Sequence, residues 1–307
     1  MTASGYLLFD KPAGKTSFAA LSGLKKTFPN ARIGHTGTLD SFATGLLIVV
    51  LGTYSRLASW FVGLDKVYEA EIRFGIGTDT LDPCGAVTGT GPIPSREALE
   101  AALPAFRGEI LQIPPDYSAI HVEGKRASSL VRKGGSISLP ARPVTIFSLE
   151  VSNFADGLAS MTIHCSSGTY VRALARDIAA ACGTCAHVSA LRRVKVGPFS
   201  VRDAIASPED AAAQAFRSLD PEAAALLGLE IASVPAEHEA AFSNGAPYVI
   251  PAIIRYEAST TGMAHGADIA SGADIAVFSS RRTFLGILEN RSGRLSYKHV
   301  MPKGELD

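Results

Sequence analysis

The most apolar run in the sequence is LLIVVL, residues Leu46–Leu51, which directly follows the Gly- and Thr-rich stretch GHTGTLDSFATG. These six residues are far fewer than the roughly 20 that a membrane-spanning helix needs. A short apolar run next to turn residues is typical of a buried strand. The sequence therefore predicts a loop that carries one carboxylate, Asp40, at the edge of a buried sheet.

Composition indicates a globular chain. Of 307 residues, 47% are hydrophobic and 19% are charged, which fits neither a disordered chain nor a membrane protein. The first residues, MTASGYLLFDKPAG, contain no basic segment before the apolar residues, and Asp10 comes too early for a signal peptide. We expect a cytoplasmic protein, long enough for one large domain or two.

Charge is unevenly divided along a chain whose net charge is zero. Residues 1–200 contain 20 Lys and Arg against 15 Asp and Glu, whereas residues 201–307 contain 9 against 14. The basic excess of the first part is compatible with a polyanionic partner such as a nucleic acid.

The cysteines do not indicate a metal site. They are Cys84, Cys165, Cys182 and Cys185, of which the last two form a lone CGTC motif. A zinc site needs two more ligands, and the sequence has no second CxxC pair and no HxxxH pair. We therefore expect ordinary reduced thiols.

Periodicity predicts both strands and helices in the first 205 residues. Alternating apolar and charged residues in YEAEIRF, 68–74, are typical of a half-buried strand. Further strands are expected at 5–9, 144–151, 158–165 and 187–202, and helices at 16–28, 95–106 and 170–181. The first helix should bury Phe18, Leu21, Leu24 and Phe28. Because strands and helices do not alternate strictly, the α+β class is favoured.

The composition changes near residue 206. Residues 206–227 are rich in Ala and predict a linker with a helix, so we expect a domain boundary within 205–230. Short strand-like segments follow, such as YVIPAIIRY, ADIAVFS and FLGILE, with Gly-containing turns between them. They predict a small β-barrel or sandwich.

Asp40 permits two interpretations. Asp commonly caps turns, so this residue can simply end the turn before the apolar strand. Alternatively, the loop presents the carboxylate to a ligand, where it can act as a nucleophile toward an electron-poor carbon. A carboxylate shielded from water needs a nearby cation to stay ionised, and Arg172 in SSGTYVRALARD is the candidate partner.

Three further side chains have alternative roles. Tyr170 lies where a Gly-containing turn enters a predicted helix, and Tyr68 begins a predicted strand. Each ring can pack in the core or line a pocket, and a Tyr face also suits stacking on a nucleobase. His35 in GHTG is either structural or able to contact a phosphate group.

Taken together, eight stretches resemble the TruB family of tRNA pseudouridine synthases. They are FDKPAGKTS, GHTGTLDSFATGLL, YEAEIRFG, GTDTLDPCG, AFRGEILQIPPDYSAI, GKRA, CSSGTYVRALARDI and HVSALRRVKVGPF. They occur in the family's order over about residues 7–205, and the combination is far more specific than any one stretch. Residues 228–307, with FLGILE and GRLSYKHVMP, resemble more weakly the PUA domain that often ends this family.

The resemblance implies a fold with three parts. A catalytic domain at 1–205 would contain a mixed, bent β-sheet with flanking helices and an RNA-binding cleft. A linker with a helix would occupy 206–229. A small β-barrel-like, PUA-like RNA-binding domain would occupy 230–307.

The resemblance also implies a reaction. A uridine of the tRNA T-loop, at position 55, would be isomerised to pseudouridine without a cofactor or a metal. The uridine would leave its stack, because stacking hides C1′ and C5 from side chains. Its N1–C1′ bond would then break, the uracil would turn, and C5 would bond to C1′. The implied partner is the T-arm stem-loop, bound by a monomer.

Site residues follow from the matched motifs. Asp40 matches the family's catalytic Asp, Arg172 matches the Arg that pairs with it, and Tyr68 matches the Tyr that stacks on the uracil. Tyr170 and Leu191 match two positions that line the pocket. His35 matches a His that contacts the flipped RNA segment, and Lys11 matches a Lys near the pocket.

The sequence departs from the family pattern beside Asp40. The family loop is usually LDPLATG, whereas this chain has LDSFATG, so Ser41 replaces a Pro that would fix one backbone angle. Phe42 replaces a smaller Leu. Elsewhere Ser167 and His121 replace common Lys residues, which removes potential phosphate contacts, and Ser128 replaces a common aromatic residue.

Other functions stay open as alternatives. A tRNA-binding chaperone with weak or no catalysis is disfavoured by the intact set of Asp40, Tyr68 and Arg172. A nucleosidase-like hydrolase would need a positioned water or a second carboxylate. Asp79 and Asp82 are near in sequence, but TDTLDPCG is more typical of a turn. Another RNA stem-loop is a third alternative, because shape commonly selects structured RNA.

Overall fold

One large mixed β-sheet organises the first two thirds of the chain. This computed structural model describes residues 4–118, 120–122, 125–126, 130, 139–207, 210–211, 216–256 and 272–301. Within these residues the sheet has nine strands: β1 (Gly5–Lys11), β2 (Ile33–Thr36), β3 (Thr44–Leu51), β4 (Lys66–Phe74), β7 (Gly108–Gln112), β10 (Arg142–Ala155), β11 (Leu158–Cys165), β12 (Ala186–Val196) and β13 (Phe199–Ser200). Their order is β1–β3–β12–β4–β11–β10–β7, with β2 attached to β3 and β13 to β12. β3 and β12 run parallel, and the other neighbours are antiparallel.

The two strands predicted with the clearest patterns are confirmed. Strand β3 is buried on both faces, with alternate residues of LLIVVL in two different apolar clusters. Strand β4 alternates buried with more exposed residues, as YEAEIRF predicts. The sheet therefore holds β3 at its interior, and the loop before β3 starts from a fixed position.

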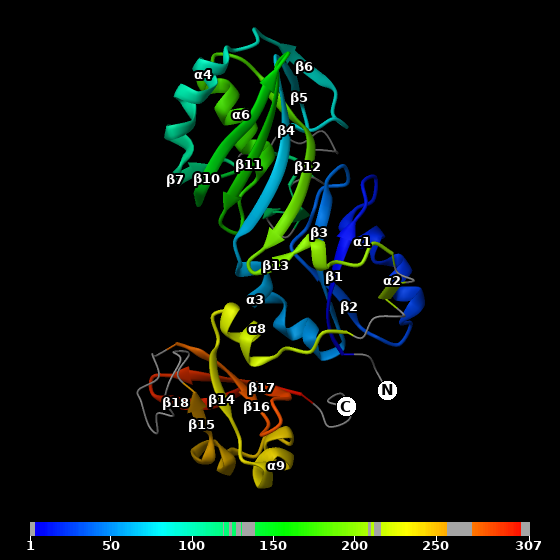
Figure 1. Cartoon of the computed structure of the whole chain (residues 1–307), viewed down its shortest axis with the longest axis vertical. Coiled ribbons are helices and arrows are strands. Elements are labelled where there is room, and N and C mark those ends of the chain that lie inside the picture. Colours follow the sequence, from blue (N-terminus) through cyan, green and yellow to red (C-terminus); the bar gives the residue numbers. More distant parts are fainter. Residues whose placement is uncertain are drawn as a thin grey trace.

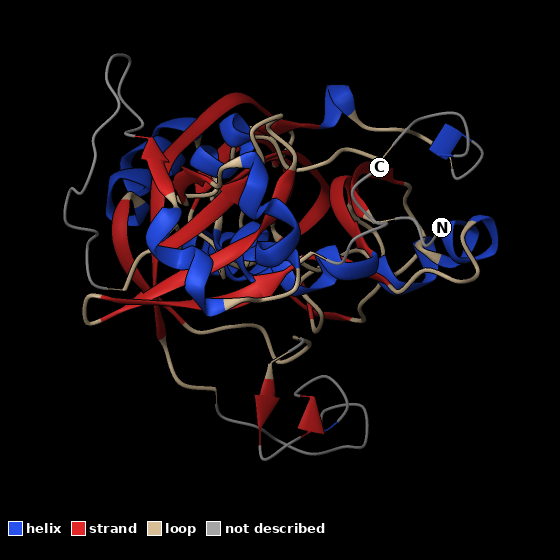
Figure 2. Ribbon diagram, turned by 90° about the horizontal axis from the view of Figure 1, so that it is seen from below, coloured by secondary structure: helices blue, strands red, loops and turns tan. Residues whose placement is uncertain are grey.

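Helices flank this sheet. They are α1 (Ser17–Ala20), α2 (Ser22–Thr27), α3 (Ala58–Gly63), α4 (Arg96–Ala102) and α6 (Val171–Ala181). α4 and α6 lie beside β10 and β11, whereas α1 and α2 lie beside β1 and β2 (Figure 1). Helix α6 buries Leu174, Ala175 and Ile178 in the cluster that β4, β11 and β12 also form. Helices and strands are intermixed when the molecule is viewed from below (Figure 2), which agrees with the mixed class expected.

The helix predicted at 16–28 is wrong in part, because the chain forms two short helices instead of one. Thr16 caps the first through a 3.1 Å hydrogen bond from Ala19 N, as an N-cap should. The helix is interrupted at Leu21, and the second helix begins at Ser22. Phe18, which the apolar spacing predicts to be buried, is 68% exposed, and its ring centroid lies 3.9 Å from Lys25 Nζ.

Short elements connect the larger ones. They are the 3₁₀ helices η1 (Gly52–Leu57), η2 (Leu103–Phe106) and η3 (Val201–Asp203), and the paired strands β5 (Ile76–Thr78) with β6 (Val87–Thr90) and β8 (His121–Val122) with β9 (Lys125–Arg126). Of the positions that depart from the family pattern, Ser128 and the side chain of His121 lie outside the described residues.

A separate, smaller sheet follows the linker. Its elements are α8 (Pro221–Leu226), β14 (Glu230–Ser233), η4 (Ala236–His238), α9 (Glu239–Ser243), η5 (Pro247–Ala252), β15 (Ile254–Tyr256), β16 (Asp274–Phe278), β17 (Phe284–Arg291) and β18 (Arg294–Val300). The strand order is β15–β14–β16–β17–β18. YVIPAIIRY is not one strand: η5 takes its first part, where Pro251 has no N–H for a strand ladder.

The smaller sheet shares an apolar core with the larger one. The rings of Tyr54 and Phe284 lie 6.0 Å apart, and those of Trp60 and His299 lie 5.9 Å apart. Tyr54 also accepts a 2.8 Å hydrogen bond from Leu219 N in the linker. α3 and α8 lie between the two sheets (Figure 1). The two parts are therefore held together by packing as well as by the linker.

Candidate active site

A cavity of about 260 Å³ brings together five of the residues predicted for the site. Asp40, Tyr68, Tyr170, Arg172 and Leu191 all line it. They come from the loop before β3, from β4, from the N-terminal turn of α6 and from β12. Segments far apart in the sequence thus meet at one pocket.

Arg172 and Asp40 form the ion pair that the sequence predicts. Arg172 Nε lies 2.8 Å from Asp40 Oδ2, and Arg172 Nη2 lies 2.9 Å from Asp40 Oδ1. The guanidinium also donates to the carbonyls of Thr80 at 2.7 Å and Tyr117 at 3.0 Å. Because a bidentate pair fixes both distance and plane, the carboxylate has one orientation in the pocket.

The N-terminus of α6 is fixed by the edge strand β7. Tyr170 is the N-cap residue, and its N–H donates to Gln112 Oε1 at 2.9 Å. Gln112 Nε2 in turn donates to the Tyr170 carbonyl at 3.2 Å, and Gln112 is only 1% exposed. This reciprocal pair sets the direction in which Arg172 leaves the helix.

Main-chain contacts hold the Asp40 loop on both sides. Ser17 Oγ accepts from Leu39 N at 2.8 Å. On the other side, Gly14 N donates to the Ser41 carbonyl at 2.8 Å. Lys11 Nζ donates to the Lys15 carbonyl at 2.7 Å and lies 3.5 Å from the Ser41 carbonyl. Ser41, which lacks the ring of the family's Pro, is thus restrained through its carbonyl oxygen.

Gly45 ends this loop at a position that only glycine fits. Its φ is 105°, a conformation that side chains disfavour. A Cβ there would also lie 2.3 Å from the Arg193 carbonyl oxygen, where β3 meets β12. The close approach brings the loop and β12 onto the same pocket.

The environment of Asp40 shifts its pKa in opposing directions. Burial raises the pKa of this carboxyl, the Arg172 guanidinium opposes that shift, and the charge of Asp82 adds to it. The resulting pKa lies above the ordinary value for Asp. A raised pKa in a cleft with a specific charge partner is typical of functional groups.

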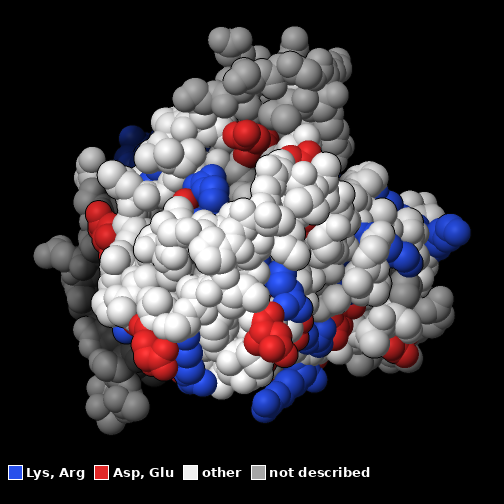
Figure 3. Space-filling model, turned by 90° about the horizontal axis from the view of Figure 1, so that it is seen from above, with Lys and Arg blue, Asp and Glu red and all other residues white. Residues whose placement is uncertain are grey.

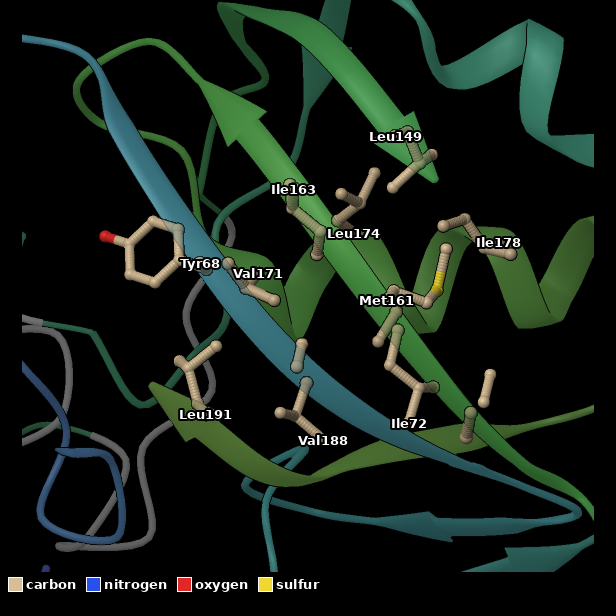
Figure 4. Close-up of a cluster of buried hydrophobic side chains, with 14 of the residues drawn as sticks. Tyr68, Ile72, Leu149, Met161, Ile163, Val171, Leu174, Ile178, Val188 and Leu191 are labelled. Atoms are coloured by element: carbon tan, nitrogen blue, oxygen red, sulfur yellow. The ribbon is translucent and has the colours of Figure 1, made fainter. Parts of the chain in front are cut away.

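Tyr68 lies at the boundary between core and pocket. Its ring borders the apolar cluster with Val171 and Leu191, and its hydroxyl points away from that cluster (Figure 4). Burial raises the pKa of the Tyr68 hydroxyl, and the Arg193 guanidinium partly opposes the shift. The hydroxyl therefore stays protonated near neutral pH.

Two predicted residues, His35 and Lys11, do not line this cavity. His35 lies on β2 opposite Val49, and burial together with Arg193 lowers its pKa. Lys11 is fully buried, and burial lowers its pKa to about 8. Their contacts connect them to the loop and to its supporting strands.

Sequence reasoning missed two buried cations of the pocket, Lys66 and Arg193. Arg193 is 1% exposed and donates to the Leu46 carbonyl at 2.8 Å and the Gly37 carbonyl at 3.1 Å. Lys66 is 6% exposed, and burial, followed by Arg193, lowers its pKa to about 8. Strand periodicity could have found both, because residues two apart share a face. Lys66 lies two residues before Tyr68, and Arg193 two residues after Leu191.

Asp82 has a second contact besides its turn. The stretch TDTLDPCG forms the predicted turn, in which Asp82 Oδ1 accepts from Cys84 N at 2.9 Å and from Thr80 Oγ1 at 2.6 Å. Asp82 Oδ2 lies 3.8 Å from Arg172 Nη1. The turn thus brings a second carboxylate to the far side of the same guanidinium.

The described residues can be compared with the requirements of a metal site and of a membrane-spanning helix. No group of three or more His, Cys, Asp and Glu side chains among them could hold a metal ion. None of the helices described is long and apolar enough to cross a membrane. On the face shown in Figure 3, basic and acidic side chains are interspersed.

Comparisons with known proteins agree with this architecture. The description "TruB family pseudouridylate synthase (N terminal domain)" matches residues 25–171, and "tRNA pseudouridylate synthase B C-terminal domain" matches residues 172–227. A protein of Borreliella burgdorferi named tRNA pseudouridine synthase B is 45% identical over 203 residues, which are 65% of this chain and 72% of the relative. The protein of that name in Caulobacter vibrioides is 48% identical over 205 residues, 66% of each chain.

Solved structures share the fold at lower identity. A chain in the crystal structure of a Cbf5–Nop10–Gar1 complex is 22% identical, with a TM-score of 0.67 over 97% of this chain and 85% of the other. A chain of an H/ACA RNP bound to a substrate RNA containing 2′-deoxyuridine is 20% identical, with a TM-score of 0.66 over 99% and 87%. The chain described here belongs to the TruB family of pseudouridylate synthases, and it is therefore an enzyme that isomerises uridine.

Proposed function

We propose that this chain is a tRNA pseudouridine synthase that acts on the T-loop uridine at position 55. The observation that carries the proposal is the bidentate Arg172–Asp40 pair inside a pocket that Tyr68 borders. Relatives that are 45% and 48% identical carry the name tRNA pseudouridine synthase B. The basic excess of residues 1–200 suits an RNA substrate. The proposed partner is the T-arm stem-loop, bound by a monomer.

The proposed reaction conserves every atom, because uridine and pseudouridine are isomers. The N1–C1′ bond breaks, the uracil turns within the pocket, and C5 forms the new bond to C1′. C5 loses one proton and N1 gains one. Because stacking hides C1′ and C5, the uridine has to leave its stack before it can reach the carboxylate inside the pocket.

In this proposal Asp40 acts on the ribose side of the flipped uridine. Arg172 holds both carboxylate oxygens, which fixes their direction and favours the ionised form in spite of burial. Tyr68 provides a ring for stacking on the uracil. Tyr170 and Leu191 complete the walls of the pocket.

Lys11 and His35 are proposed to act outside the pocket. Lys11 holds the Asp40 loop through the carbonyls of Lys15 and Ser41. His35 is proposed to contact the RNA segment beside the flipped uridine. Its Nδ1 is buried and has no hydrogen-bond partner among the described residues.

The proposed domain division is catalytic at 1–205, linker at 206–229 and PUA-like RNA-binding at 230–307. The separate sheet β15–β14–β16–β17–β18 supports the last part. Arg281, in the turn between β16 and β17, and Arg294, at the start of β18, are exposed. We expect the double variant Arg281→Ala, Arg294→Ala to bind tRNA more weakly and with a smaller salt dependence. The rate at which bound tRNA reacts should not change. Unchanged affinity would remove the RNA-binding role of these two residues.

The central test uses an unmodified tRNA transcript and maps pseudouridine by chemical labelling and primer extension. We expect one T-loop pseudouridine with the native chain and none with Asp40→Asn, although the variant still binds the tRNA. Pseudouridine formed normally by Asp40→Asn would contradict the catalytic assignment. Tight tRNA binding without any pseudouridine in the native chain would favour the chaperone instead.

A further inference from the structure

Two buried hydroxyl groups belong to residues that line the pocket. Ser118 Oγ and Thr169 Oγ1 are buried, and neither has a hydrogen-bond partner among the described residues. Both residues line the same cavity of about 260 Å³ as Asp40 and Tyr68. Two unsatisfied donors at a substrate pocket need an explanation.

Their neighbours do not satisfy them. Burial raises the pKa of Tyr170, and the nearby Ser118 partly opposes the shift. Burial likewise raises the pKa of Cys165 to about 11, and the nearby Thr169 partly opposes it. Each hydroxyl thus has a polar neighbour, but neither contact has hydrogen-bond geometry.

Location in the pocket does not by itself leave a hydroxyl unpaired. Ser166 lines the same cavity, and its Oγ accepts a hydrogen bond from Thr145 N at 2.9 Å. Buried polar groups in native proteins nearly always have a partner in the protein, in water or in a ligand. Among the described residues of this cavity, the Ser166 hydroxyl therefore has a partner, whereas the two buried hydroxyls of Ser118 and Thr169 do not.

Ser118 and Thr169 line the cavity from different segments of the chain. Ser118 follows Tyr117, whose carbonyl accepts from Arg172, so it lies next to the Arg172–Asp40 pair. Thr169 lies just before α6 and near Cys165, at the end of β11. They can therefore contact different edges of one bound base.

We propose that Ser118 Oγ and Thr169 Oγ1 donate hydrogen bonds to the two carbonyl oxygens of the flipped uracil. This inference rests on the proposed function and specifies how the pocket holds its base. A hydroxyl can donate equally well to O2 or to O4 of uracil. The two residues are positioning residues, because they contact the base but take no part in making or breaking its bonds.

The symmetry of uracil explains why two equivalent donors suit this reaction. A half-turn about the line through N3 and C6 exchanges N1 with C5 and, at the same time, O2 with O4. The two hydroxyls therefore face carbonyl oxygens both before and after the base turns. They hold the detached uracil in either orientation, which keeps C5 directed at C1′ after the turn.

The test is a double-mutant cycle between protein hydroxyls and substrate carbonyls. Single-turnover rates are measured for stem-loop RNAs that contain uridine, 2-thiouridine or 4-thiouridine at the target position. The proteins are the native chain, Ser118→Ala, Thr169→Val and the control Ser166→Ala. Sulfur accepts hydrogen bonds more weakly than oxygen. We therefore expect each thio substitution in the RNA to slow the reaction of the native protein roughly three- to tenfold. Each loss of a hydroxyl, in Ser118→Ala or Thr169→Val, should slow the reaction on uridine RNA by about three- to tenfold as well.

The expected result is coupling specific to the two unpaired hydroxyls. In Ser118→Ala and Thr169→Val, at least one thio substitution should have less effect than in the native chain. In Ser166→Ala the rate effects of the protein substitution and of each thio substitution should multiply, as independent effects do. Thr169→Ser keeps a hydroxyl, so it should react at the native rate, unlike Thr169→Val. Multiplicative effects in every variant, with normal activity of the native chain on uridine RNA, would overturn this inference alone. No pseudouridine from the native chain would overturn the proposed function and this inference with it.

Discussion

Two buried guanidinium groups border the pocket, and they are held in opposite ways. On one side Arg172 contacts carboxylates, namely both oxygens of Asp40 and, at 3.8 Å, Asp82. On the other side Arg193 donates to main-chain carbonyls, those of Leu46 and Gly37. One arginine thus holds the charged group itself, and the other holds the two ends of the loop that carries it.

This difference separates electrostatic control from positional control of Asp40. Arg172 opposes the rise in the Asp40 pKa, whereas Arg193 is not among the main groups that shift it. Arg193 instead lowers the pKa values of Lys66, His35 and Tyr68. Variants of the two arginines should therefore differ in pH dependence as well as in rate.

The largest effect is expected for Arg172→Met. Asp40 then loses its cation, so the single-turnover rate should fall by about 100-fold or more. The free energy of unfolding should fall by about 1–3 kcal/mol, which is less than for a fully buried pair, because the Asp40 side chain is 36% exposed and water can hydrate it. Rapid-quench kinetics and urea unfolding measure the two quantities.

Arg176→Met is the matched control for that variant. Arg176 is on the same helix and pairs with its neighbour Asp177, with side chains 34% and 32% exposed. We expect a change of at most about 1 kcal/mol in unfolding and little change in rate. Equal rate losses in the two variants would show that Arg172 acts through helix stability alone.

Arg193→Met should have a smaller effect on rate and leave the pH dependence of Asp40 in place. Removal of the buried charge stabilises the fold, because its desolvation cost is lost. The loss of the donor to two carbonyls destabilises it, so the two contributions partly offset each other. We expect about a tenfold slower reaction and about 1–2 kcal/mol less stability. Arg192→Met is the control, since Arg192 is the adjacent residue and pairs with Asp10 at the more exposed face.

The acid limb of kcat/KM should separate the two sides of the pocket. If Asp40 reacts as a carboxylate, activity falls as pH falls through its pKa, which burial has raised. Arg172→Met should move this limb to higher pH, because Arg172 lowers that pKa. Asp82→Asn should move it to lower pH, because the charge of Asp82 raises that pKa. A limb that moves equally in Arg193→Met would break the distinction between the two arginines.

The sequence predicts the Arg172 side of this comparison much better than the Arg193 side. Arg172 lies in a distinctive motif, and its pairing with Asp40 is confirmed. Arg193 lies in RRVK, a stretch that resembles a solvated strand face. Only the period of β12, counted from Leu191, places it inward and Arg192 outward.

Other features depend on contacts that a single sequence does not contain. Ser118 and Thr169 are ordinary loop residues in the sequence, and only the fold shows that their hydroxyls are buried without partners among the described residues. The expected helix at 16–28 has good apolar spacing, yet the helix is interrupted at Leu21 and Phe18 is exposed. By contrast, LLIVVL could be predicted, because a short, β-branched-rich run that is apolar on both faces and lies next to turn residues is typical of a strand in the interior of a sheet.

The smallest effect is expected for Ser41→Pro, which restores the residue usual in the family loop. Pro restricts the unfolded chain and should raise the free energy of unfolding by about 0.4–1 kcal/mol if the loop can accommodate it. The Ser41 carbonyl can still accept from Gly14 N, so the present loop contacts survive. Ser41→Ala serves as the control for loss of the hydroxyl, and thermal unfolding measures the difference.

Combining Ser41→Pro with each arginine variant sharpens the comparison further. If Arg193 acts by holding the loop, a stiffer loop should recover part of the rate lost in Arg193→Met. It should recover none of the rate lost in Arg172→Met, because no backbone restraint replaces the missing cation beside Asp40. Equal recovery in both variants would mean that Arg172, too, acts mainly by positioning Asp40. In that case Arg172→Met should leave the acid limb of kcat/KM at its native pH.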